Sequence, residues 1–439
     1  VYKRQPRNSN WFLLALAGRR AITFLEQQAE VDPERLGFTG YSMGGNITSY
    51  CAIDRRLKAV APMVGGTGFL AQDFPGLPGS SMAVHYRDPE HYSSTMDSSA
   101  YWPLVRCPVL FLNATNDFHG IFERSYQCAD LLPHDNWCAS YNLHFNHSLR
   151  AEQWAALNLF FDNHLKGAGL GLPQRAKTVV KHHPWEKTAA VTITPDPARM
   201  KDLVSIEILY SHDPNPRSRF WVTHQKPEPT ETLDLKLPVR PNLPLFAFAN
   251  LTYRLPQPMA TFQDSNPPTA TFTITSEIVS IHPGEFKTKT LRTGASHQAV
   301  FHDFAAQGVK GWGSSSHRAR ITTYRFQDPA RAVPPPTASM RFHFGKIEKP
   351  TVLVLRLSRN EWLLNKEKKA SFTAIKVVGP GTAHVDVKPA DFKDKDQAPL
   401  DNWEDITTFS LELAHQNPRK GIDLTRLENQ GILRKITWE

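Results

Sequence analysis

The sequence predicts a multidomain protein: an α/β region with a mostly parallel sheet, followed by two all-β sandwich domains. Between residues 9 and 166, helical segments alternate with short apolar strands, which is typical of a sheet with helices on both faces. After Gly171 the pattern changes to short strands separated by Pro, Asn and Asp turns. A chain of 439 residues is long enough for about three domains, and we place them at residues 1–170, 175–285 and 286–439.

Composition excludes several classes of protein. Hydrophobic residues make up 40% of the chain and charged residues 21%, which is enough apolar surface to fill cores and argues against wholesale disorder. No apolar run approaches the roughly 18 to 20 residues of a spanning helix, so we expect no integral membrane protein. The net charge of +9 comes from the later part, because residues 1–170 hold only 14 of the 51 basic and 15 of the 42 acidic side chains. Since the remaining basic residues are interspersed with acids, a solvated surface is favoured over a nucleic-acid groove.

In the α/β region the ends of the helices carry recognisable signals. Ser9 or Asn10 can cap a first helix that Asp32-Pro33 ends, and Lys166-Gly167 closes the last helix. Residues 66–105 are rich in Gly, Pro and Ser, which indicates a cap inserted between two strands. The predicted order is a helix to Glu30, strand 36–40, helix 44–54, strand 58–64, the cap with a short helix near 88–97, strand 108–113, helix 121–132, strand 140–145 and helix 149–165.

The β-rich part divides at a looser stretch, 284–336, which ends in three prolines. Within its strands apolar residues alternate with others, most clearly in Phe342-x-Phe344, as expected where one face of a sheet is buried. The first set of strands is predicted at 203–210, 219–223, 233–237, 245–255 and 270–281, and the second at 340–344, 351–357, 370–378, 384–387, 407–413 and 432–438.

Cysteine and histidine patterns give little support for a metal or redox centre. The cysteines, at 51, 107, 128 and 138, form no C-x-x-C pair. Buried free thiols are favoured, and a Cys128–Cys138 bridge stays open as the alternative. His182-His183 has no further ligands at metal spacing, which favours a solvated loop. We therefore expect no metal and no organic cofactor.

The segment Gly40-Tyr41-Ser42-Met43-Gly44-Gly45 lies between a predicted strand and a predicted helix. A serine in such a tight turn stands above the carboxyl end of the strand, and small residues at 40 and 44 let strand and helix pass closely. The Met43 backbone N–H, at the helix N-terminus, then points toward an oxyanion that develops beside Ser42. This position predicts a nucleophile rather than a structural turn.

A serine nucleophile needs a base, and the base needs an orienting carboxylate. Asp117 follows the strand 109–113 and His147 follows the strand 140–145, so both lie in loops at the same sheet edge as Ser42. The chain order Ser, Asp, His is that of α/β enzymes with a nucleophile elbow. We therefore predict Ser42 as nucleophile, His147 as base and Asp117 as the partner of the base.

Other polar residues nearby are weaker candidates for the base or the acid. His144 falls within the predicted strand, where a buried histidine with satisfied ring nitrogens is the usual outcome. His119 stands next to the acid and is expected to shape the pocket, and Tyr41 is with it a candidate for substrate contact. Asp135 and Glu123 lie in or after a helix, away from the expected edge.

At these residues the sequence resembles the α/β-hydrolase superfamily, and within it the dienelactone hydrolase/acetyl xylan esterase-like group. The resemblance rests on Gly37-Phe38-Thr39-Gly40-Tyr41-Ser42-Met43-Gly44-Gly45-Asn46, on Asn116-Asp117-Phe118-His119-Gly120, and on Asn146-His147 with the helix that ends at Gly167. It covers about residues 9–170 and implies part of an α/β-hydrolase domain, a carboxylic ester hydrolase with a Ser-His-Asp triad. Such domains begin with further strands, and a loop after an early strand gives the second oxyanion donor. Because the chain has no initiator Met or signal-peptide pattern and is helical by residue 9, we expect a fragment without its upstream part, with foreign residues within Val1–Gln5.

The β-rich part has a weaker resemblance. Phe301-His302-Asp303-Phe304, Gly311-Trp312 and Asn402-Trp403 resemble a jelly-roll module of the galactose-binding or carbohydrate-binding kind, and residues 178–283 resemble an immunoglobulin-like sandwich. Trp312, Trp362 and Trp403 are candidates for stacking on sugar rings, although core packing is the commoner role for any one of them.

The first hypothesis from the sequence is a serine esterase that acts on carbohydrate or aryl esters through an acyl-enzyme. A serine peptidase of the prolyl-oligopeptidase type has the same triad order and is one alternative. A catalytically inert glycan-binding protein is the other. The expected partners are a small-molecule or polysaccharide ester and a glycan at the C-terminal module, with no nucleic acid and no membrane. Export from the cell is expected for an enzyme that acts on polysaccharides, and this expectation comes from the resemblance alone.

Overall fold

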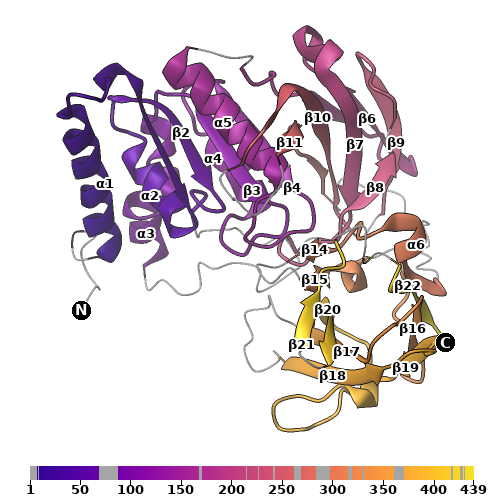
Figure 1. Ribbon diagram of the computed structural model, residues 1–439. Helices are drawn as coiled ribbons and strands as arrows, with labels where there is room; N and C mark the ends of the chain where they lie inside the picture. The colour runs from indigo at the N-terminus through magenta and orange to yellow at the C-terminus, as the bar shows by residue number, and fades with distance from the viewer. Residues whose placement is uncertain are drawn as a thin grey trace.

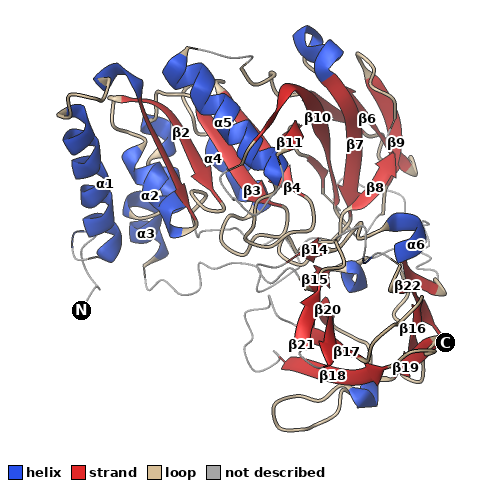
Figure 2. Cartoon of the chain, in the orientation of Figure 1, coloured by secondary structure: helices blue, strands red, loops and turns tan. Residues whose placement is uncertain are grey.

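A computed structural model arranges the described part of the chain as one parallel sheet with its helices and four antiparallel sheets (Figures 1 and 2). No helix in this part is long and apolar enough to cross a membrane. The described residues are 7, 9–68, 88–167, 171–213, 215–225, 227–240, 243–261, 268–282, 297–314, 319–328, 331–359, 370–416, 419–425, 429 and 431–439.

The parallel sheet keeps its four strands in chain order, and this order places the carboxyl ends of all four at one edge. The last three of these strands are mostly buried on both faces, as parallel strands covered by helices are, whereas the first strand, at the sheet edge, is only partly buried. The strands are β1 (Leu36–Tyr41), β2 (Leu57–Met63), β3 (Val109–Ala114) and β4 (Trp137–Asn142). The helices are α1 (Asn10–Glu26), α2 (Met43–Cys51), α3 (Pro89–Thr95), α4 (Phe122–Ala129) and α5 (Ala151–Lys166), with short 3-10 turns at Pro33–Arg35, Ser98–Ala100 and Trp102–Leu104.

Helix α5 lies between two hydrophobic cores. One set of its side chains (Trp154, Leu157 and Phe160) packs against the parallel sheet. The other set (Ala155, Ala156 and Leu159) packs against antiparallel strands from the middle of the chain. Those strands form a sheet in the order β11-β10-β7-β8, with β12 on β10, and a sheet in the order β5-β6-β9. They are β5 (Lys177–Lys181), β6 (Thr188–Thr194), β7 (Leu203–Ser211), β8 (Val222–Gln225), β9 (Leu233–Pro238), β10 (Leu245–Met259), β11 (Thr269–Thr275) and β12 (Val279–Ile281), with a 3-10 turn at Pro197–Asp202.

The middle strands also cover the β4 edge and helix α4 of the N-terminal α/β region. The Phe122 ring lies 5.4 Å from Trp221 and 5.0 Å from Phe248, measured between ring centroids. Tyr126 donates its hydroxyl to the Ser276 carbonyl at 2.7 Å. The middle strands therefore contribute side chains to the hydrophobic cores beside the parallel sheet.

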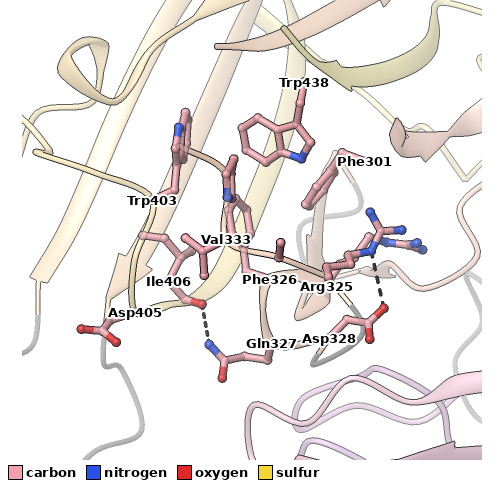
Figure 3. Close-up of a pocket in the computed structure, with 13 residues that line it drawn as sticks. Phe301, Arg325, Phe326, Gln327, Asp328, Val333, Trp403, Asp405, Ile406 and Trp438 are labelled. Carbon is pink, nitrogen blue, oxygen red and sulfur yellow. Dashed lines mark hydrogen bonds and ion pairs between the residues drawn. The ribbon is translucent and has the colours of Figure 1, made fainter. Parts of the chain in front are cut away.

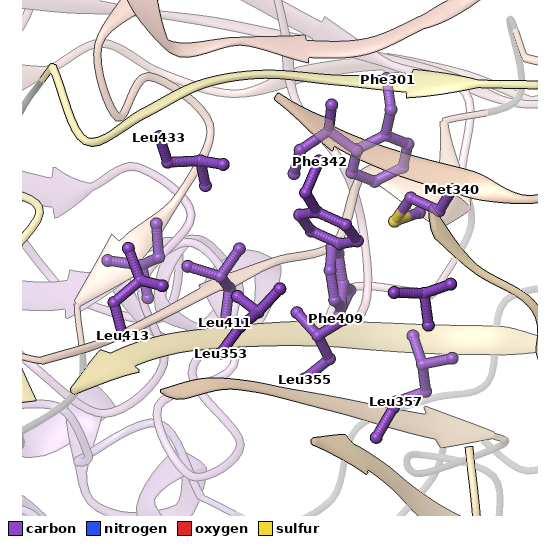
Figure 4. Close-up of a cluster of buried hydrophobic side chains, with 14 of the residues drawn as sticks. Phe301, Met340, Phe342, Leu353, Leu355, Leu357, Phe409, Leu411, Leu413 and Leu433 are labelled. Carbon is purple, nitrogen blue, oxygen red and sulfur yellow. The ribbon is translucent and has the colours of Figure 1, made fainter. Parts of the chain in front are cut away.

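The C-terminal region has a core of its own, enclosed between two antiparallel sheets (Figure 4). Trp312 and Trp403 belong to this core and are 2% and 1% exposed, so they have the commoner role, core packing, rather than the alternative of stacking on sugars; Trp362 lies outside the described residues. The sheet orders are β13-β22-β16-β19 and β14-β15-β20-β17-β18, with β21 on β20. The elements are β13 (Val300–Asp303), α6 (Phe304–Gln307), β14 (Gly313–Ser314), β15 (Arg320–Thr323), β16 (Met340–Phe344), β17 (Thr351–Arg359), β18 (Ala370–Val378), β19 (His384–Val387), β20 (Ile406–Gln416), β21 (Arg419–Ile422) and β22 (Leu433–Trp438), with 3-10 turns at Arg325–Gln327 and Pro389–Asp391.

Several element ends differ from those the sequence predicts. The first helix ends at Glu26 rather than Glu30. Just after this end, the Gln28 side chain donates to the Phe24 carbonyl. Strand β4 begins and ends three residues earlier than 140–145, because the apolar residues that suggested a strand continue into the buried loop that follows it. The predicted strand 270–281 is divided into β11 and β12.

Candidate active site

Ser42 stands in the tight turn between β1 and α2, as the pattern of glycines predicts. Its φ of 60° and ψ of −115° are unusual for a residue with a side chain. A Cβ on Gly40 would lie 2.3 Å from the Gly44 carbonyl oxygen, so only glycine fits at position 40. The prediction that position 44 also requires a small residue is wrong, because an added Cβ there meets no atom within 4 Å. An added Cβ on Gly45, in contrast, would lie 2.7 Å from the Met63 carbonyl oxygen. The helix thus turns position 45, not 44, toward β2.

The structure brings the three residues predicted for chemistry to one place. The Oγ atom of Ser42 lies 2.6 Å from Nε2 of His147. Nδ1 of the same ring lies 3.1 and 3.2 Å from the two carboxylate oxygens of Asp117. Because a carboxylate accepts, Nδ1 carries the proton and Nε2 presents its lone pair to the serine hydroxyl. This arrangement can remove a proton from Ser42 as its oxygen attacks a carbonyl.

Asp117 is held in a fixed position and is only 1% exposed. Its Oδ1 accepts hydrogen bonds from the backbone N–H groups of His119 and Gly120, both at 2.6 Å. These donors satisfy Oδ1 of this buried carboxyl group, since a buried polar atom without a partner is costly. The loop after β3 therefore presents the Asp117 side chain to the histidine in a fixed orientation.

The loop that carries His147 is fixed by residues far away in the chain. The Tyr41 hydroxyl donates to the His147 carbonyl at 2.9 Å. The Asn146 side chain accepts from the Phe118 N–H at 3.1 Å, and the Phe118 ring lies 4.7 Å from the imidazole. His147 itself has a φ of 52°, a conformation that needs such support in a residue with a side chain.

Tyr41 and His119, the two candidates for substrate contact, each hold part of the site. The Tyr41 ring stacks on Trp154 at 6.3 Å, and burial raises the pKa of its hydroxyl to about 12. His119 has Nδ1 at 3.0 Å from the Val64 carbonyl and Nε2 at 3.0 Å from the Asn46 amide nitrogen, so its Nδ1 is the protonated nitrogen. Burial lowers the pKa of His119, which keeps the ring neutral. The ring of His119 thus lies beside that of His147, 5.8 Å away between ring centroids.

His144 does not lie in β4, as the sequence suggests, but in the buried turn after it. It has a φ of 58° and is 3% exposed. Its Nε2 accepts from the Trp221 N–H at 2.9 Å, and its ring stacks on Phe220 at 4.6 Å. Burial lowers the pKa of His144 to about 3. This neutral histidine ties the loop of His147 to the middle region.

Two buried asparagines support the site and were missed by the sequence reasoning. The Asn46 Oδ1 accepts from the Gly66 N–H at 2.7 Å, and the Asn113 Oδ1 accepts from the Gly65 N–H at 3.1 Å. They hold the segment after β2 directly against the Ser42 turn, where a Cβ on Gly65 would lie 2.4 Å from the Ser42 carbonyl oxygen. A polar residue within or just after a buried apolar element is the signal that could have identified them.

Met43 is the first residue of α2, so its N–H has no acceptor within the helix. Asp135 and Glu123 lie away from the three residues; Glu123 forms an ion pair with Arg219. Among the described residues no cluster of His, Cys, Asp or Glu could hold a metal ion. All four cysteines are free, so the alternative Cys128–Cys138 bridge is not formed.

The C-terminal region contains a cavity of about 280 Å³ that the sequence did not predict (Figure 3). Trp438 lines it together with Phe326 and the edge of Trp403. Gln327 donates to the Ile406 carbonyl at 2.6 Å beside these rings.

A serine on a strand–turn–helix junction, within hydrogen-bond reach of a histidine that faces a buried carboxylate, is the geometry of an α/β serine hydrolase. Residues 11–144 match the sequence profile of the dienelactone hydrolase family, which confirms the resemblance seen in the sequence over that stretch. No curated protein matches the chain.

Solved structures of hydrolases match the chain in part. A cold-adapted esterase from an Arctic intertidal metagenomic library is 20% identical; the match covers 36% of this chain and 58% of that one, with a TM-score of 0.26. Acetyl xylan esterase 1 from Thermoanaerobacterium sp. JW/SL YS485 is 14% identical over 34% of this chain and 51% of that one, with a TM-score of 0.26. The acylaminoacyl peptidase of Pyrococcus horikoshii is 19% identical over 38% of this chain and 29% of that one, with a TM-score of 0.30. The chain thus spans less than two thirds of each of these proteins.

Proposed function

We propose that the protein is a serine carboxylic ester hydrolase in which Ser42 is the nucleophile, His147 the base and Asp117 its partner. The observation that supports this most is the 2.6 Å approach of the Ser42 hydroxyl to Nε2 of a histidine whose Nδ1 faces a buried carboxylate. A hydroxyl is a weak nucleophile at neutral pH and needs such a base.

The proposed reaction has two steps. In the first, Ser42 attacks the ester carbonyl while its proton moves to His147, and the Met43 N–H stabilises the oxyanion. The tetrahedral intermediate collapses when His147 gives that proton to the departing alcohol, which leaves an acyl-enzyme. In the second, His147 takes a proton from water, the hydroxide attacks the acyl group, and Ser42 is restored.

The finer proposal is a carbohydrate esterase of the acetyl xylan esterase-like kind, with a glycan held by the C-terminal region. Its support is the sequence resemblance, together with the family match over residues 11–144. A jelly-roll fold for the C-terminal region and an immunoglobulin-like fold for the middle region belong to the same proposal. The serine peptidase and the inert glycan-binding protein are the outcomes that would replace it.

The test is hydrolysis of 4-nitrophenyl acetate by the full chain, with labelling by a fluorophosphonate probe. We expect Ser42→Ala to abolish labelling and to lower kcat by about four orders of magnitude or more, with the thermal unfolding midpoint unchanged. Asp117→Asn should lower kcat about 10⁴-fold while the serine is retained. An unlabelled wild-type chain would favour the inert binding protein, and faster cleavage of a peptide anilide than of the ester would favour the peptidase.

A further inference from the structure

The backbone segment that follows β2, Val64–Gly68, packs against two parts of the proposed site at once. A Cβ on Gly65 would lie 2.4 Å from the Ser42 carbonyl oxygen and 3.2 Å from the His119 ring. The carbonyl of Val64, the residue before this glycine, lies 3.0 Å from Nδ1 of His119. The position of the segment therefore affects both Ser42 and His119.

This segment has a backbone conformation that needs support from its surroundings. Val64 has a φ of 43°, which is unusual for a β-branched residue. Two buried asparagines hold the end of the segment nearest β2, together with the indole N–H of Trp102, which donates to the Gly66 carbonyl at 2.9 Å. The other end, at Thr67 and Gly68, is held from a different direction.

Arg124 of α4 holds that other end through one edge of its guanidinium group. Its Nε donates to the Thr67 carbonyl at 3.1 Å, and its Nη2 donates to Oδ1 of Asp97 at 2.9 Å. Because the guanidinium group is planar and rigid, two donors on the same edge fix the directions of both acceptors together. The side chains of Arg124 and Asp97 are 14% and 0% exposed, so this ion pair is largely shielded from solvent.

Asp97 in turn packs directly on the last residue of the segment. A Cβ on Gly68 would lie 2.3 Å from Oδ2 of Asp97. Oδ1 also accepts from the N–H and the hydroxyl of Ser99, at 3.0 and 2.6 Å. A buried ion pair is weak evidence for stability, because the cost of removing two charges from water offsets most of their attraction. The clearest effect of this pair is geometric, since it fixes where Thr67 and Gly68 lie.

We propose that Arg124 is a positioning residue for the proposed ester hydrolysis. It holds Val64–Gly68 in the place where the backbone of this segment supports the Ser42 turn and the His119 ring. His119 also donates its backbone N–H to the Asp117 carboxylate, so the support reaches the acid as well as the serine. The proposal rests on the proposed function and adds a residue to it.

The test is Arg124→Lys in the full chain. A lysine keeps the charge beside Asp97, but its ammonium group is a point charge and cannot place two donors on Thr67 and Asp97 as the guanidinium edge does. We expect kcat/KM for 4-nitrophenyl acetate, and the second-order rate constant for labelling by a fluorophosphonate probe, each to fall about tenfold, with KM changed by less than about twofold. Amide hydrogen exchange in peptides that cover Val64–Gly68 should become at least about fivefold faster.

Arg56→Lys is the matched control. Arg56 uses the same guanidinium edge on Asp54, with Nε at 2.9 Å and Nη2 at 2.7 Å, and the Asp54 side chain is 5% exposed. Arg56 directly precedes β2, at the end of the strand opposite to Val64–Gly68. This change should lower the thermal unfolding midpoint as Arg124→Lys does, but leave both rates and the exchange in Val64–Gly68 unchanged. If Arg124→Lys does not fold, the double variant Arg124→Gln/Asp97→Asn, which buries no unpaired charge, replaces it with the same expectations.

Equal losses of activity in Arg124→Lys and Arg56→Lys would overturn the proposal, because general loosening would then explain both. A rise in KM with an unchanged kcat would also overturn it, since Arg124 would then act on substrate binding. If the wild type neither cleaves the ester nor reacts with the probe, the proposed function fails, and hydrogen exchange decides the role of Arg124 separately. Faster exchange in Val64–Gly68 for Arg124→Lys alone would support its role in holding the segment, and unchanged exchange would overturn that role.

Discussion

The turn of Ser42 and the loop of His147 meet at one point, but they are held in different ways. The turn is set by its immediate neighbours: Gly40 makes room for the helix backbone, and Ser42 bonds to Met63 on the adjacent strand. The loop is set by distant residues, since Tyr41, Trp221 and Gly313 contact it from three parts of the chain. Both places contain residues with side chains at positive φ, at 42, 144 and 147. In the Ser42 turn the strained backbone is held mainly by its immediate neighbours. In the His147 loop it is held by contacts with distant parts of the chain.

The first prediction tests how the Ser42 turn depends on its immediate neighbours. In Gly40→Ala the new Cβ meets the Gly44 backbone at 2.3 Å, and no side chain can move away to relieve the contact. We expect kcat/KM to fall about 100-fold, because a displacement of about 1 Å at a nucleophile costs that much. The unfolding free energy should fall by about 1–3 kcal/mol. Ester hydrolysis and urea unfolding measure the two effects.

Gly44→Ala is the matched control for this change. An added Cβ at Gly44 meets no atom within 4 Å, and alanine is the better helix former. Activity close to that of the wild type is expected. If both alanine variants lose activity equally, the close contact at position 40 is not what shapes the turn.

The second prediction tests how the His147 loop depends on contacts with distant residues. A Cβ at Gly313 would lie 2.4 Å from the His144 carbonyl oxygen, so Gly313→Ala should shift the loop that carries His147. The loop can yield more than the turn, and we expect about a tenfold fall in kcat with little change in KM. Gly379→Ala, in the same region with no atom within 4 Å of its added Cβ, should have no effect. Equal activities of the two variants would show that the C-terminal region does not position the histidine.

The difference between the two places also decides what the sequence could predict. The Ser42 turn is a local solution, so its glycines and its position between a strand and a helix appear as a short motif. Asp117 and His147 were predicted from chain order and from the rule that parallel strands end at one edge. The helices and most of the strands followed from apolar periodicity, because each element needs only one buried face.

What the sequence could not predict depends on contacts between distant segments. The role of Tyr41 as an anchor of the His147 carbonyl requires two residues that are 106 positions apart. The packing of the middle strands on α5 is also invisible, since alanines such as Ala155 and Ala156 carry no specific signal for a second core. For the tryptophans at 312 and 403 the sequence left sugar stacking open beside the commoner core packing, because composition cannot separate a buried ring from an exposed one.

The third prediction uses the pH dependence of the buried His144. Its pKa is lowered to about 3 in the folded protein, against 6.5 for an ordinary histidine. Below pH 6.5 the unfolded chain takes up a proton that the folded protein refuses, so stability is lost as the pH falls toward 3. The slope is about 1.4 kcal/mol per pH unit, or about 2–3 kcal/mol between pH 6.5 and 4.5.

His144→Asn tolerates the positive φ and removes the titrating ring. This variant should be less stable than the wild type at pH 7, where it loses the stack on Phe220. The difference in unfolding free energy between wild type and variant should be about 2 kcal/mol smaller at pH 4.5 than at pH 7, as measured by chemical unfolding at the two pH values. A difference in unfolding free energy that does not change with pH would mean that the pKa of His144 is not lowered in the folded protein.

The smallest effect is expected where only one hydrogen bond to the loop is removed. Tyr41→Phe keeps the ring on Trp154 and loses the donor to the His147 carbonyl. One such bond contributes about 0.5–1.5 kcal/mol, so kcat should fall about three- to tenfold. Tyr126→Phe is the matched control, because its hydroxyl also donates to a backbone carbonyl, that of Ser276, but away from the site. It should cost similar stability and leave kcat unchanged. A fall in kcat for both variants would mean that general loosening explains the effect, and the loop would then be less dependent on Tyr41 than the geometry implies.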